Sequence, residues 1–533
     1  MNQHAEETMH KRKVAIIDIL GKSRSRAAFS RYARPNNQSI MPQVVAVWAE
    51  ELGHDVSMVY YDGPDCLLGA CPDDVDIVFI TAFSQNAMLA YALSNYYRSK
   101  GAVTALGGPH SRSYPDDTVK YFDYAIGFCD KELLNDILQD CASYRPVGQY
   151  LSSPQQPASL PGVVQRWKFI EPILQKAPLM KVIPMIGSLG CPYTCSFCID
   201  ALVPYQPLAF DALKEDLRFI LKNKPPRTVV AWHDPNFGIR FDDYLGAIEE
   251  AIPPASLTFI AETSMALLKE ENCIRLKKNG FKAMLPGIES WYEVGNKSKV
   301  RAITGMEKVR QVADHANRIM RHIPYLQANL IFGLDSDEGA EPFELTRRFV
   351  DLAPGVFPYF SLLMSYGRNA PDNLRYQRDG RVLDIPFHFL NQLHAMNVRP
   401  LHYSWHEFFT HVCATYDYAF SPRALYRRFM ANSHLGSRFD QLFRGWASER
   451  NHKLIRNHRK MCDLLTHDRP LIDYLEGRTN TMPEKYIEPI RTDLDWLWPW
   501  LPEGAIYHDP NAYLASVDDG ATATEARAGM ALA

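Results

Sequence analysis

The stretch Gly187-Ser-Leu-Gly190-Cys191-Pro-Tyr-Thr-Cys195-Ser-Phe-Cys198 places three cysteines within eight residues, with the spacing C-x3-C-x2-C. It continues an apolar run at residues 182–188 that predicts a β-strand. Thiolates are the soft ligands that hold iron–sulfur clusters. A cubane cluster held by three protein thiolates leaves one iron open, and an open iron can bind a substrate or a cofactor. The small residues of this stretch allow the backbone to approach such a cluster closely.

Two other interpretations of the three cysteines stay open. They are three reduced cysteines that lie close by chance, or part of a zinc site. Zinc normally takes four ligands, and His233 could be the fourth, but the pair-plus-pair spacing typical of structural zinc sites is absent.

The remaining cysteines are scattered, and ten cysteines in 533 residues do not make a disulfide scaffold. We therefore expect a cytoplasmic, reducing location. The scattered cysteines are Cys66, Cys71, Cys129, Cys141, Cys273, Cys413 and Cys462.

Strands and helices alternate on the C-terminal side of the cysteines. One more predicted strand, at residues 182–188, directly precedes the cysteines. Asp211 can cap a helix with an apolar face at i, i+4, i+7 and i+8 spacing. Six βα units in a row predict a (β/α)6 partial barrel over residues 181–370, with its chemistry at the carboxyl ends of the strands. The expected strands are 182–188, 228–232, 257–261, 282–285, 327–332 and 359–364, and the expected helices between them include 243–251, 267–279 and 306–322.

The same alternation precedes the cysteines. Apolar runs at 13–19, 56–61, 77–81, 103–106 and 124–126 predict strands, and 41–52 and 87–100 have helical spacing. This pattern is typical of an α/β, flavodoxin-like doubly wound domain over residues 13–141, with ligands at the carboxyl ends of its strands.

The other parts of the chain follow from composition. We expect a flexible N-terminus at 1–12, a Ser/Pro-rich linker at 142–180, a mostly helical C-terminal cap at 371–515 and a disordered tail at 516–533. Aromatic and basic residues of the cap could line a substrate pocket, although core packing is the favoured explanation for them.

Bulk composition narrows the class of protein. The chain has 46% hydrophobic and 22% charged residues and a formal charge of −3, so no general affinity for nucleic acid is expected. No apolar stretch is long enough for a membrane span, and the N-terminal segment has no secretory signal pattern.

The spacing of the cysteines, with Phe197 before the last one, closely resembles the signature of the radical S-adenosylmethionine (SAM) superfamily. The resemblance implies that Cys191, Cys195 and Cys198 hold a [4Fe–4S] cluster whose open iron binds SAM. It also implies reductive cleavage of SAM to a 5′-deoxyadenosyl radical, with electrons from a donor such as flavodoxin or ferredoxin.

Later segments agree with this family in order and spacing. Asn236 ends a Trp-His-Asp-Pro-Asn sequence after the second barrel strand, and Glu262 follows the third. Glu289 and Ser290 lie in a Gly-Ile-Glu-Ser segment that resembles one common in the cobalamin-type branch. Gly333, after the fifth strand, resembles the segment near the adenine of SAM. The resemblance implies that these five residues help to bind the cofactor.

The N-terminal domain, placed ahead of such a barrel, looks like the cobalamin-binding domain of that branch. The matching residues are Thr81 and Ser84 after the third strand and Gly107 and Gly108 after the fourth. His110, two residues further on, is a possible cobalt ligand but is expected at the loop surface.

The loop after the first strand, Asp18-Ile-Leu-Gly21, lacks the histidine of the Asp-x-His-x-x-Gly pattern that many cobalamin domains carry. Members of this branch often lack it, so cobalamin remains the expected second cofactor. A flavodoxin-like domain that has lost this ligand is the alternative.

The resemblance implies an enzyme, most simply a cobalamin-dependent methyltransferase acting on an unactivated carbon of a small-molecule, natural-product or lipid substrate. The main alternative is a radical SAM oxidative cyclase or carbon–carbon bond-forming enzyme without methyl transfer, whose cobalamin-like domain need not bind cobalamin. A cluster-bearing binding protein is the alternative outside enzymes.

Overall fold

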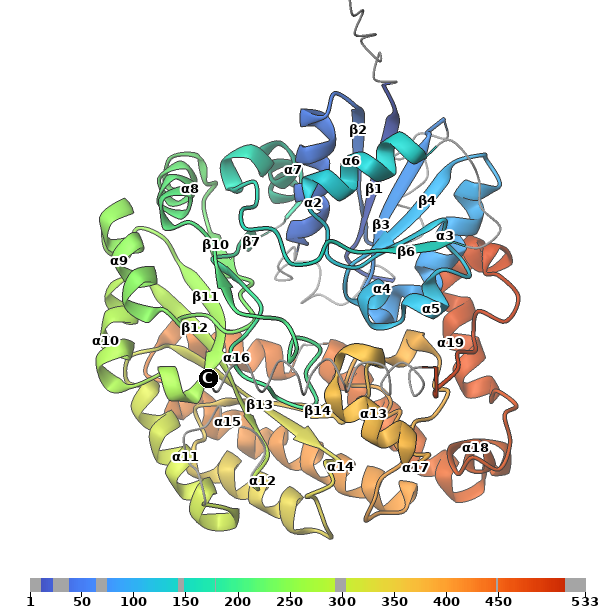
Figure 1. Ribbon diagram of the computed structural model, residues 1–533. Coiled ribbons are helices and arrows are strands. Elements are labelled where there is room, and N and C mark those ends of the chain that lie inside the picture. The colour runs from blue at the N-terminus through green and yellow to red at the C-terminus, as the bar shows by residue number, and fades with distance from the viewer. Residues whose placement is uncertain are drawn as a thin grey trace, which may run out of the picture.

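Two six-stranded parallel sheets organise the computed structural model of this chain (Figure 1). The structure describes residues 11–22, 38–63, 74–141, 148–177, 179–292, 303–446 and 449–512. Most of the expected flexible N-terminus, the expected disordered tail and two of the scattered cysteines, Cys66 and Cys71, lie outside the described residues.

The first sheet has the strand order β2-β1-β3-β4-β5-β6, and every neighbouring pair is parallel. The order reverses between β1 and β3, as in flavodoxin-like doubly wound folds, so the expected fold class is confirmed. Its strands are β1 (Lys13–Ile19), β2 (Asp55–Tyr61), β3 (Ile77–Thr81), β4 (Val103–Gly107), β5 (Tyr124–Ile126) and β6 (Gln149–Leu151).

Both faces of this sheet are buried, which explains the continuous apolar runs of its strands. Val14, Ile16 and Phe79 pack under α2 (Ile40–Glu51) and α6 (Lys131–Asp140). Side chains of opposite parity on the same strands pack under α3 (Ala87–Arg98). Two short helices, α4 (Pro109–Ser113) and α5 (Pro115–Thr118), follow β4.

The expected linker at 142–180 is wrong for two of its segments. Gln149–Leu151 forms strand β6, which pairs with β5. The serines that suggested a linker satisfy backbone donors instead: Phe128 N donates to Ser152 Oγ at 3.0 Å and Asp130 N to Ser153 Oγ at 3.2 Å. A three-residue strand at a sheet edge leaves too short an apolar pattern to be recognised in a sequence.

The second wrong segment is α7 (Val163–Lys176), a helix that bridges the two sheets. Its buried Arg166 donates to Gln43 Oε1 of α2 at 2.7 Å and to the carbonyl oxygen of Pro184 at 3.4 Å. Pro184 belongs to the first strand of the second sheet. Arg166 therefore connects the two sheets, which a loose linker would not do.

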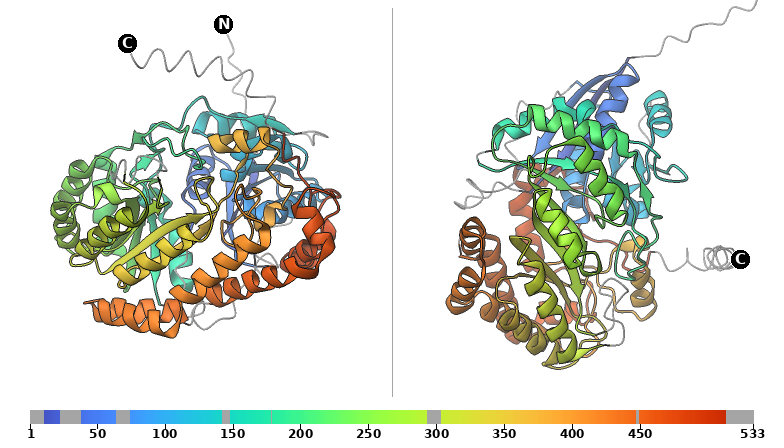
Figure 2. Two further views of the ribbon diagram at one scale, coloured as in Figure 1. Left: turned by 90° about the horizontal axis from the view of Figure 1, so that it is seen from below. Right: turned by 90° about the vertical axis from the view of Figure 1, so that its left-hand side faces the viewer.

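The second sheet has the order β14-β13-β12-β11-β10-β7, all parallel, so consecutive strands are neighbours as in a partial barrel. The strands are β7 (Lys181–Met185), β10 (Thr228–Trp232), β11 (Phe259–Ser264), β12 (Phe281–Glu289), β13 (Tyr325–Phe332) and β14 (Phe357–Leu362). The helices between them are α8 (Phe210–Asn223), α9 (Phe241–Ala251), α10 (Glu270–Lys278), α11 (Gly305–Ile319) and α12 (Glu341–Leu352), which lie outside the curved sheet (Figure 2).

Burial alternates along the barrel strands. In β12, Met284 and Ile288 are buried on the helix side, whereas Leu285, Gly287 and Glu289 are half-buried on the other side. The inner face of the partial barrel is therefore accessible, which leaves room for ligands there.

The C-terminal region is helical, as expected, with one isolated bridge between Val382 and Val398. Its last described part returns to the first sheet, where α19 (Glu484–Leu494) lies near α3 (Figure 1). The ring centroid of Tyr96 of α3 lies 5.4 Å from that of Trp496 and 5.2 Å from that of Trp500. The helices are α13 (Pro371–Arg378), α14 (Trp405–Ala419), α15 (Pro422–Ala431), α16 (Leu435–Trp446), α17 (Glu449–His467), α18 (Arg469–Leu475) and α19 (Glu484–Leu494).

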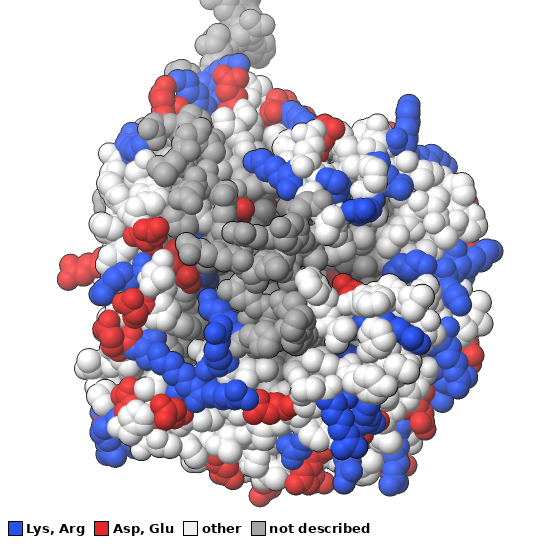
Figure 3. Space-filling view, turned by 180° about the vertical axis from the view of Figure 1, so that it is seen from behind, with Lys and Arg blue, Asp and Glu red and all other residues white. Residues whose placement is uncertain are grey.

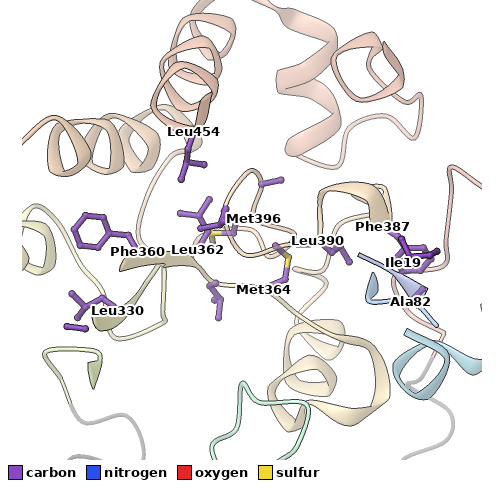
Figure 4. Packing of buried hydrophobic residues seen from close by; sticks show 14 of the residues in the cluster. Ile19, Ala82, Leu330, Phe360, Leu362, Met364, Phe387, Leu390, Met396 and Leu454 are labelled. Atoms are coloured by element: carbon purple, nitrogen blue, oxygen red, sulfur yellow. The ribbon is translucent and has the colours of Figure 1, made fainter. Parts of the chain in front are cut away.

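One apolar cluster connects the first sheet to the barrel. Phe387 of the C-terminal region lies beside Ile19 and Ala82, at the carboxyl edge of the first sheet, and Leu362 and Met396 continue the cluster toward the barrel strands (Figure 4). The C-terminal region thus fills the space between the two sheets. Among the described residues, none of the helices combines the length and apolar character needed to cross a bilayer.

Candidate active site

The three cysteines lie on a loop at the carboxyl edge of the barrel. After β7 the chain forms β8 (Ser188–Leu189), which pairs antiparallel with β9 (Gln206–Pro207) and closes the base of the loop. Gly190 has a φ of +66°, and a Cβ there would lie 2.2 Å from the carbonyl oxygen of Pro204. Cys191 N donates to Val203 O at 3.3 Å beside this close approach. Only glycine fits at position 190 without moving the opposite side of the loop.

Cys191 and Cys195 are buried and Cys198 is half-buried. Cys198 N donates to Cys195 O at 2.9 Å, and Cys198 Sγ accepts from Asp200 N at 3.4 Å. Within the described ranges, no three His, Cys, Asp or Glu side chains converge as a finished metal site, and that includes the cysteines with His233. The donor set, three soft thiols on one loop, nevertheless fits an iron–sulfur cubane with one open iron by ligand type and number.

Asp234 anchors the base of the cysteine loop. It is buried and accepts hydrogen bonds from Gly187 N at 3.1 Å, Ser188 Oγ at 2.6 Å and Tyr244 OH at 2.5 Å. Burial raises the pKa of the Asp234 carboxyl, while these donors act in the opposite direction. In the sequence, Asp234 is one residue of the Trp-His-Asp-Pro-Asn segment, and nothing there marks it as an anchor.

A second anchor holds the middle of the loop. Ser196, between two of the cysteines, donates from Oγ to Asp372 Oδ2 at 2.6 Å, and Asp372 N donates back to Ser196 O at 2.9 Å. Asp372 is in the first turn of α13, directly after the sixth barrel strand and its loop. The cysteine loop therefore spans the open side of the partial barrel.

A third anchor connects the loop to the first sheet. Asp200, two residues after the last cysteine, forms an ion pair with Arg112 of α4 at 2.8 Å. Both side chains are half-buried, at 26% and 17% exposure, so solvent screens the pair only in part. Arg112 follows the Gly107-Gly108 sequence closely, so the pair brings the two candidate cofactor loops together.

Other contacts fix the same junction. Tyr114 OH donates to Ser365 O at 3.2 Å, and a Cβ at Gly367 would lie only 2.0 Å from Ser113 O. Ser365 and Gly367 follow β14, whereas Ser113 and Tyr114 follow β4. The carboxyl edges of the two parallel sheets therefore face each other.

The two expected cofactor-binding carboxylates lie on neighbouring strands. Glu262 of β11 is exposed and Glu289 of β12 is half-buried, and both strands present these residues with the inner-face parity of the barrel. Glu289 has a φ of +67°, rare for a residue with a side chain, at a register shift between β12 and β13. A Cβ at Gly287 would lie 2.0 Å from Glu289 Oε1, so the glycine makes space for this carboxylate.

Asn236 is buried, and neither its Nδ2 nor its Oδ1 has a hydrogen-bond partner among the described residues. The hydroxyl of Ser264, at the carboxyl end of β11, is also buried and has no hydrogen-bond partner among the described residues. A buried amide without partners is costly. Both groups lie at the carboxyl ends of adjacent barrel strands, where a bound ligand could satisfy them.

Ser290 and Gly333 have visible structural roles. Ser290 is buried with outer-face parity, and its Oγ accepts from Tyr292 N at 3.1 Å. Gly333 is buried below the C-terminal region, where an added Cβ would lie 2.9 Å from Met396 Sδ and 3.2 Å from the Phe408 ring. Ser290 therefore does not share the inner-face parity of the two carboxylates.

The four expected residues of the first sheet lie together at the carboxyl ends of β3 and β4. Gly108 has a φ of +94°, and a Cβ there would lie 3.1 Å from Thr81 Cγ2. A Cβ at Gly107 would meet nothing within 4 Å, so open space lies above this strand end. Ser84 is buried, and the ring of Phe83 beside it is 52% exposed. Open space and an exposed ring at the carboxyl ends of these neighbouring strands fit a large ligand with an apolar face.

The expectation that His110 lies at the loop surface is wrong. Pro109 starts helix α4, which turns His110 inward until it is fully buried. Tyr91 OH lies 2.6 Å from His110 Nε2 and donates to Asp117 Oδ2 at 2.6 Å, so Nε2 carries the imidazole proton. Burial lowers the pKa of His110 to about 3, and its Nδ1 has no hydrogen-bond partner among the described residues.

Comparison with known proteins identifies relatives in sequence, although no family model matches the chain. The chain is 22% identical over 355 residues to bacteriochlorophyllide d C-12(1)-methyltransferase of Chlorobaculum tepidum, which covers 66% of this chain and 71% of that protein. It is 24% identical over 373 residues to the bacteriochlorophyllide d C-8(2)-methyltransferase of the same organism, covering 67% and 77%.

Solved structures share the fold. The cobalamin-dependent S-adenosylmethionine radical enzyme OxsB, with aqua-cobalamin bound, aligns with a TM-score of 0.52 and 11% identity, covering 94% of this chain and 85% of that chain. The radical S-adenosylmethionine methyltransferase TsrM from Kitasatospora setae, with cobalamin and a [4Fe–4S] cluster, aligns with a TM-score of 0.50 and 14% identity, covering 69% and 78%.

Proposed function

We propose that this chain, a radical SAM protein of the cobalamin-binding branch, transfers a methyl group to an unactivated carbon of a small molecule. The observation that carries the proposal is the ion pair between Asp200 and Arg112. It joins the cysteine loop of the barrel to the glycine loop of the first sheet. Methyl transfer of this kind needs both cofactors at one substrate, and this junction supports such an arrangement.

In this proposal Cys191, Cys195 and Cys198 hold a [4Fe–4S] cluster through their thiolates. When bound, the cluster supplies the electron that cleaves SAM, and cobalamin carries the methyl group. Glu289 and Glu262 provide negative charge on the inner face, suited to the ammonium and the ribose hydroxyls of SAM.

The remaining proposed binding residues act through hydrogen bonds and shape. Asn236 supplies a buried amide whose donors and acceptor are unused within the described chain. Ser290 and Gly333 support this binding region through the turn from Ser290 to Tyr292 and the close packing at Gly333.

Thr81, Ser84, Gly107 and Gly108 form the proposed cobalamin cradle. Gly107 leaves open space and Gly108 allows a close backbone approach. The exposed ring of Phe83 would offer the cofactor an apolar contact. The described part of the chain has no histidine at the Asp-x-His-x-x-Gly position of the first loop, so these four residues would hold cobalamin without a histidine from that loop.

The substrate is a small molecule, and the relatives' names make a bacteriochlorophyllide the first compound to test. The electron donor in this proposal is a flavodoxin or a ferredoxin. Nucleic acid is not part of the proposal, because the formal net charge of the chain is −3. On the face opposite to that of Figure 1, the described residues include side chains of both signs (Figure 3).

One observation favours a second candidate function. The alignment with OxsB, a cobalamin-dependent S-adenosylmethionine radical enzyme, covers 94% of this chain, against 69% for the methyltransferase TsrM. Oxidative cyclisation or carbon–carbon bond formation without methyl transfer is therefore the alternative reaction for the same site.

The test is anaerobic incubation of the reconstituted protein with SAM, a reductant, cobalamin and bacteriochlorophyllide d. We expect both 5′-deoxyadenosine and S-adenosylhomocysteine. 5′-Deoxyadenosine without S-adenosylhomocysteine would favour the alternative reaction. Cys195→Ala should form no 5′-deoxyadenosine, and formation at the parental rate would refute the proposal.

A variant of the junction tests the observation that carries the proposal. Arg112→Gln removes the charge that pairs with Asp200, so we expect the ratio of S-adenosylhomocysteine to 5′-deoxyadenosine to fall about tenfold or more, because the two cofactor loops lose their alignment. The matched control is Arg275→Gln, which breaks an ion pair with Glu249 on the outer helices. The control should leave the ratio unchanged; an equal effect of the two variants contradicts the role of the junction.

A further inference from the structure

Two of the cysteines that are far apart in the sequence lie side by side in the C-terminal region. Cys413 is on α14 and Cys462 on α17, and their sulfur atoms are 3.5 Å apart. A disulfide bond is about 2.05 Å long, so a movement of about 1.5 Å would bring the sulfurs to bonding distance. Both side chains are half-buried, which leaves a path for a small oxidant.

The two helices hold this pair in place through other contacts. Asp417, one turn after Cys413, forms an ion pair with Arg459 at 2.6 Å. His458 of α17 packs against the rings of Phe409 and Tyr416 of α14, with centroid-to-centroid distances of 5.8 and 5.4 Å. The contact between the sulfurs therefore belongs to a packed helix interface and not to two loose side chains.

The two thiols differ in their surroundings. The hydrogen bond from Cys413 lowers the pKa of Cys462 to about 7, with further help from the hydroxyl of Thr410. The same hydrogen bond and burial raise the pKa of Cys413. Cys462 is thus suited to be the attacking thiolate and Cys413 the thiol that follows, as in dithiols that exchange with disulfides.

We propose that Cys413 and Cys462 form a redox site that closes to an intramolecular disulfide when it meets a small disulfide such as oxidised glutathione. Cys462 attacks one glutathione sulfur and expels the other glutathione as a thiolate. Cys413 then loses its proton to solvent, attacks the sulfur of Cys462 and releases the second glutathione. The protein loses two hydrogen atoms, and one glutathione disulfide becomes two thiols.

This site does not depend on the proposed methyl transfer, because neither cysteine is part of the cysteine loop or of the inner face of the barrel. Its product is a covalent link between α14 and α17. Phe408 of α14 covers Gly333 at the carboxyl end of β13, so the link would fix the helix that packs on this part of the barrel.

The experiment equilibrates the anaerobic holoenzyme with a series of ratios of reduced to oxidised glutathione. Acid quenching, alkylation of the remaining thiols and digestion without reductant are followed by mass spectrometry. We expect a linked peptide pair containing Cys413 and Cys462, lighter by two hydrogen atoms than the reduced pair. The visible absorbance of the cluster should stay constant, which separates this site from the cysteine loop.

Variants make the order of attack testable. Cys413→Ser should stop at a glutathione adduct on Cys462, whereas Cys462→Ser should leave Cys413 mostly alkylated. Cys273→Ser, on the buried cysteine of α10, is the matched control and should leave the linked pair unchanged. Wild-type protein that remains fully alkylated at both positions, or that accumulates only glutathione adducts, would overturn the proposal.

Discussion

Gly190→Ala is the sharpest test of how the cysteine loop is built. The φ of +66° costs a residue with a side chain about 1–2 kcal/mol. The added Cβ would also lie 2.2 Å from the carbonyl oxygen of Pro204, and relief of such a contact costs about 1–3 kcal/mol more. Together the closed loop should lose about 2–5 kcal/mol relative to an opened one.

We expect the protein to remain folded after this change, because opening one loop leaves the two sheets intact. We expect the loop to part next to Cys191, where the backbone hydrogen bond to Val203 is adjacent, so that the three thiols lose their common register. The measurement is the iron and sulfide content per chain after anaerobic reconstitution, together with the free energy of unfolding from denaturant titration.

Two control variants separate the causes. Gly101→Ala has a similar φ of +87° with nothing within 4 Å, so it should cost only the backbone strain and keep the full iron content. Gly246→Ala, inside α9 with open space around it, should stabilise the protein by up to about 1 kcal/mol. If Gly190→Ala matched Gly101→Ala in iron content and in free energy of unfolding, the contact with Pro204 would not be what shapes the loop.

Other residues give independent tests. Asp234→Asn removes the charge that accepts three hydrogen bonds, so we expect a loss of about 1.5–3 kcal/mol in unfolding free energy by denaturant titration and less iron per chain. Burial raises the pKa of Asp337 to about 7, against about 3.9 in an unfolded chain, so the folded state holds this proton more tightly. The free energy of unfolding should therefore fall as the pH rises from about 4 to about 7, by up to about 4 kcal/mol, and level off above it. Asp337→Asn should remove this part of the slope in denaturant titrations across that range, and an unchanged slope contradicts burial as its cause. Gly367→Ala, with its Cβ 2.0 Å from Ser113 O, should speed amide hydrogen exchange in α4, whereas Gly380→Ala, with open space, should not.

Much of the fold was accessible from the sequence because period and length of apolar runs reflect burial. Residues 228–232 were predicted as a strand and form β10 with these bounds. The two sheets of parallel strands followed from the alternation of strands and helices. Strand β6 is not predicted, because three residues at a sheet edge are too few to show an apolar pattern. The serines next to it suggest a linker, and only the structure shows that they accept hydrogen bonds from Phe128 N and Asp130 N.

The candidate site was accessible only where its residues are close in the sequence. The three cysteines are recognised by spacing alone. The anchors of their loop are not, because Asp234 lies 46 residues from Ser188, Asp372 lies 176 residues from Ser196, and Arg112 lies 88 residues from Asp200. A single sequence contains no signal for such pairings. For the same reason, the contact between the sulfurs of Cys413 and Cys462, 49 residues apart, could not be predicted from the sequence.

The seam between the two sheets limits how this protein can be rearranged. Arg368 donates to Arg112 O at 3.2 Å and Asn369 to Ser113 Oγ at 3.3 Å, so α4, the cysteine loop and the turn after β14 are shaped by one another. A chimaera that imports only the N-terminal half from another protein would bring a mismatched surface to this seam. Exchange of substrate preference by module swapping therefore has to carry all three segments together.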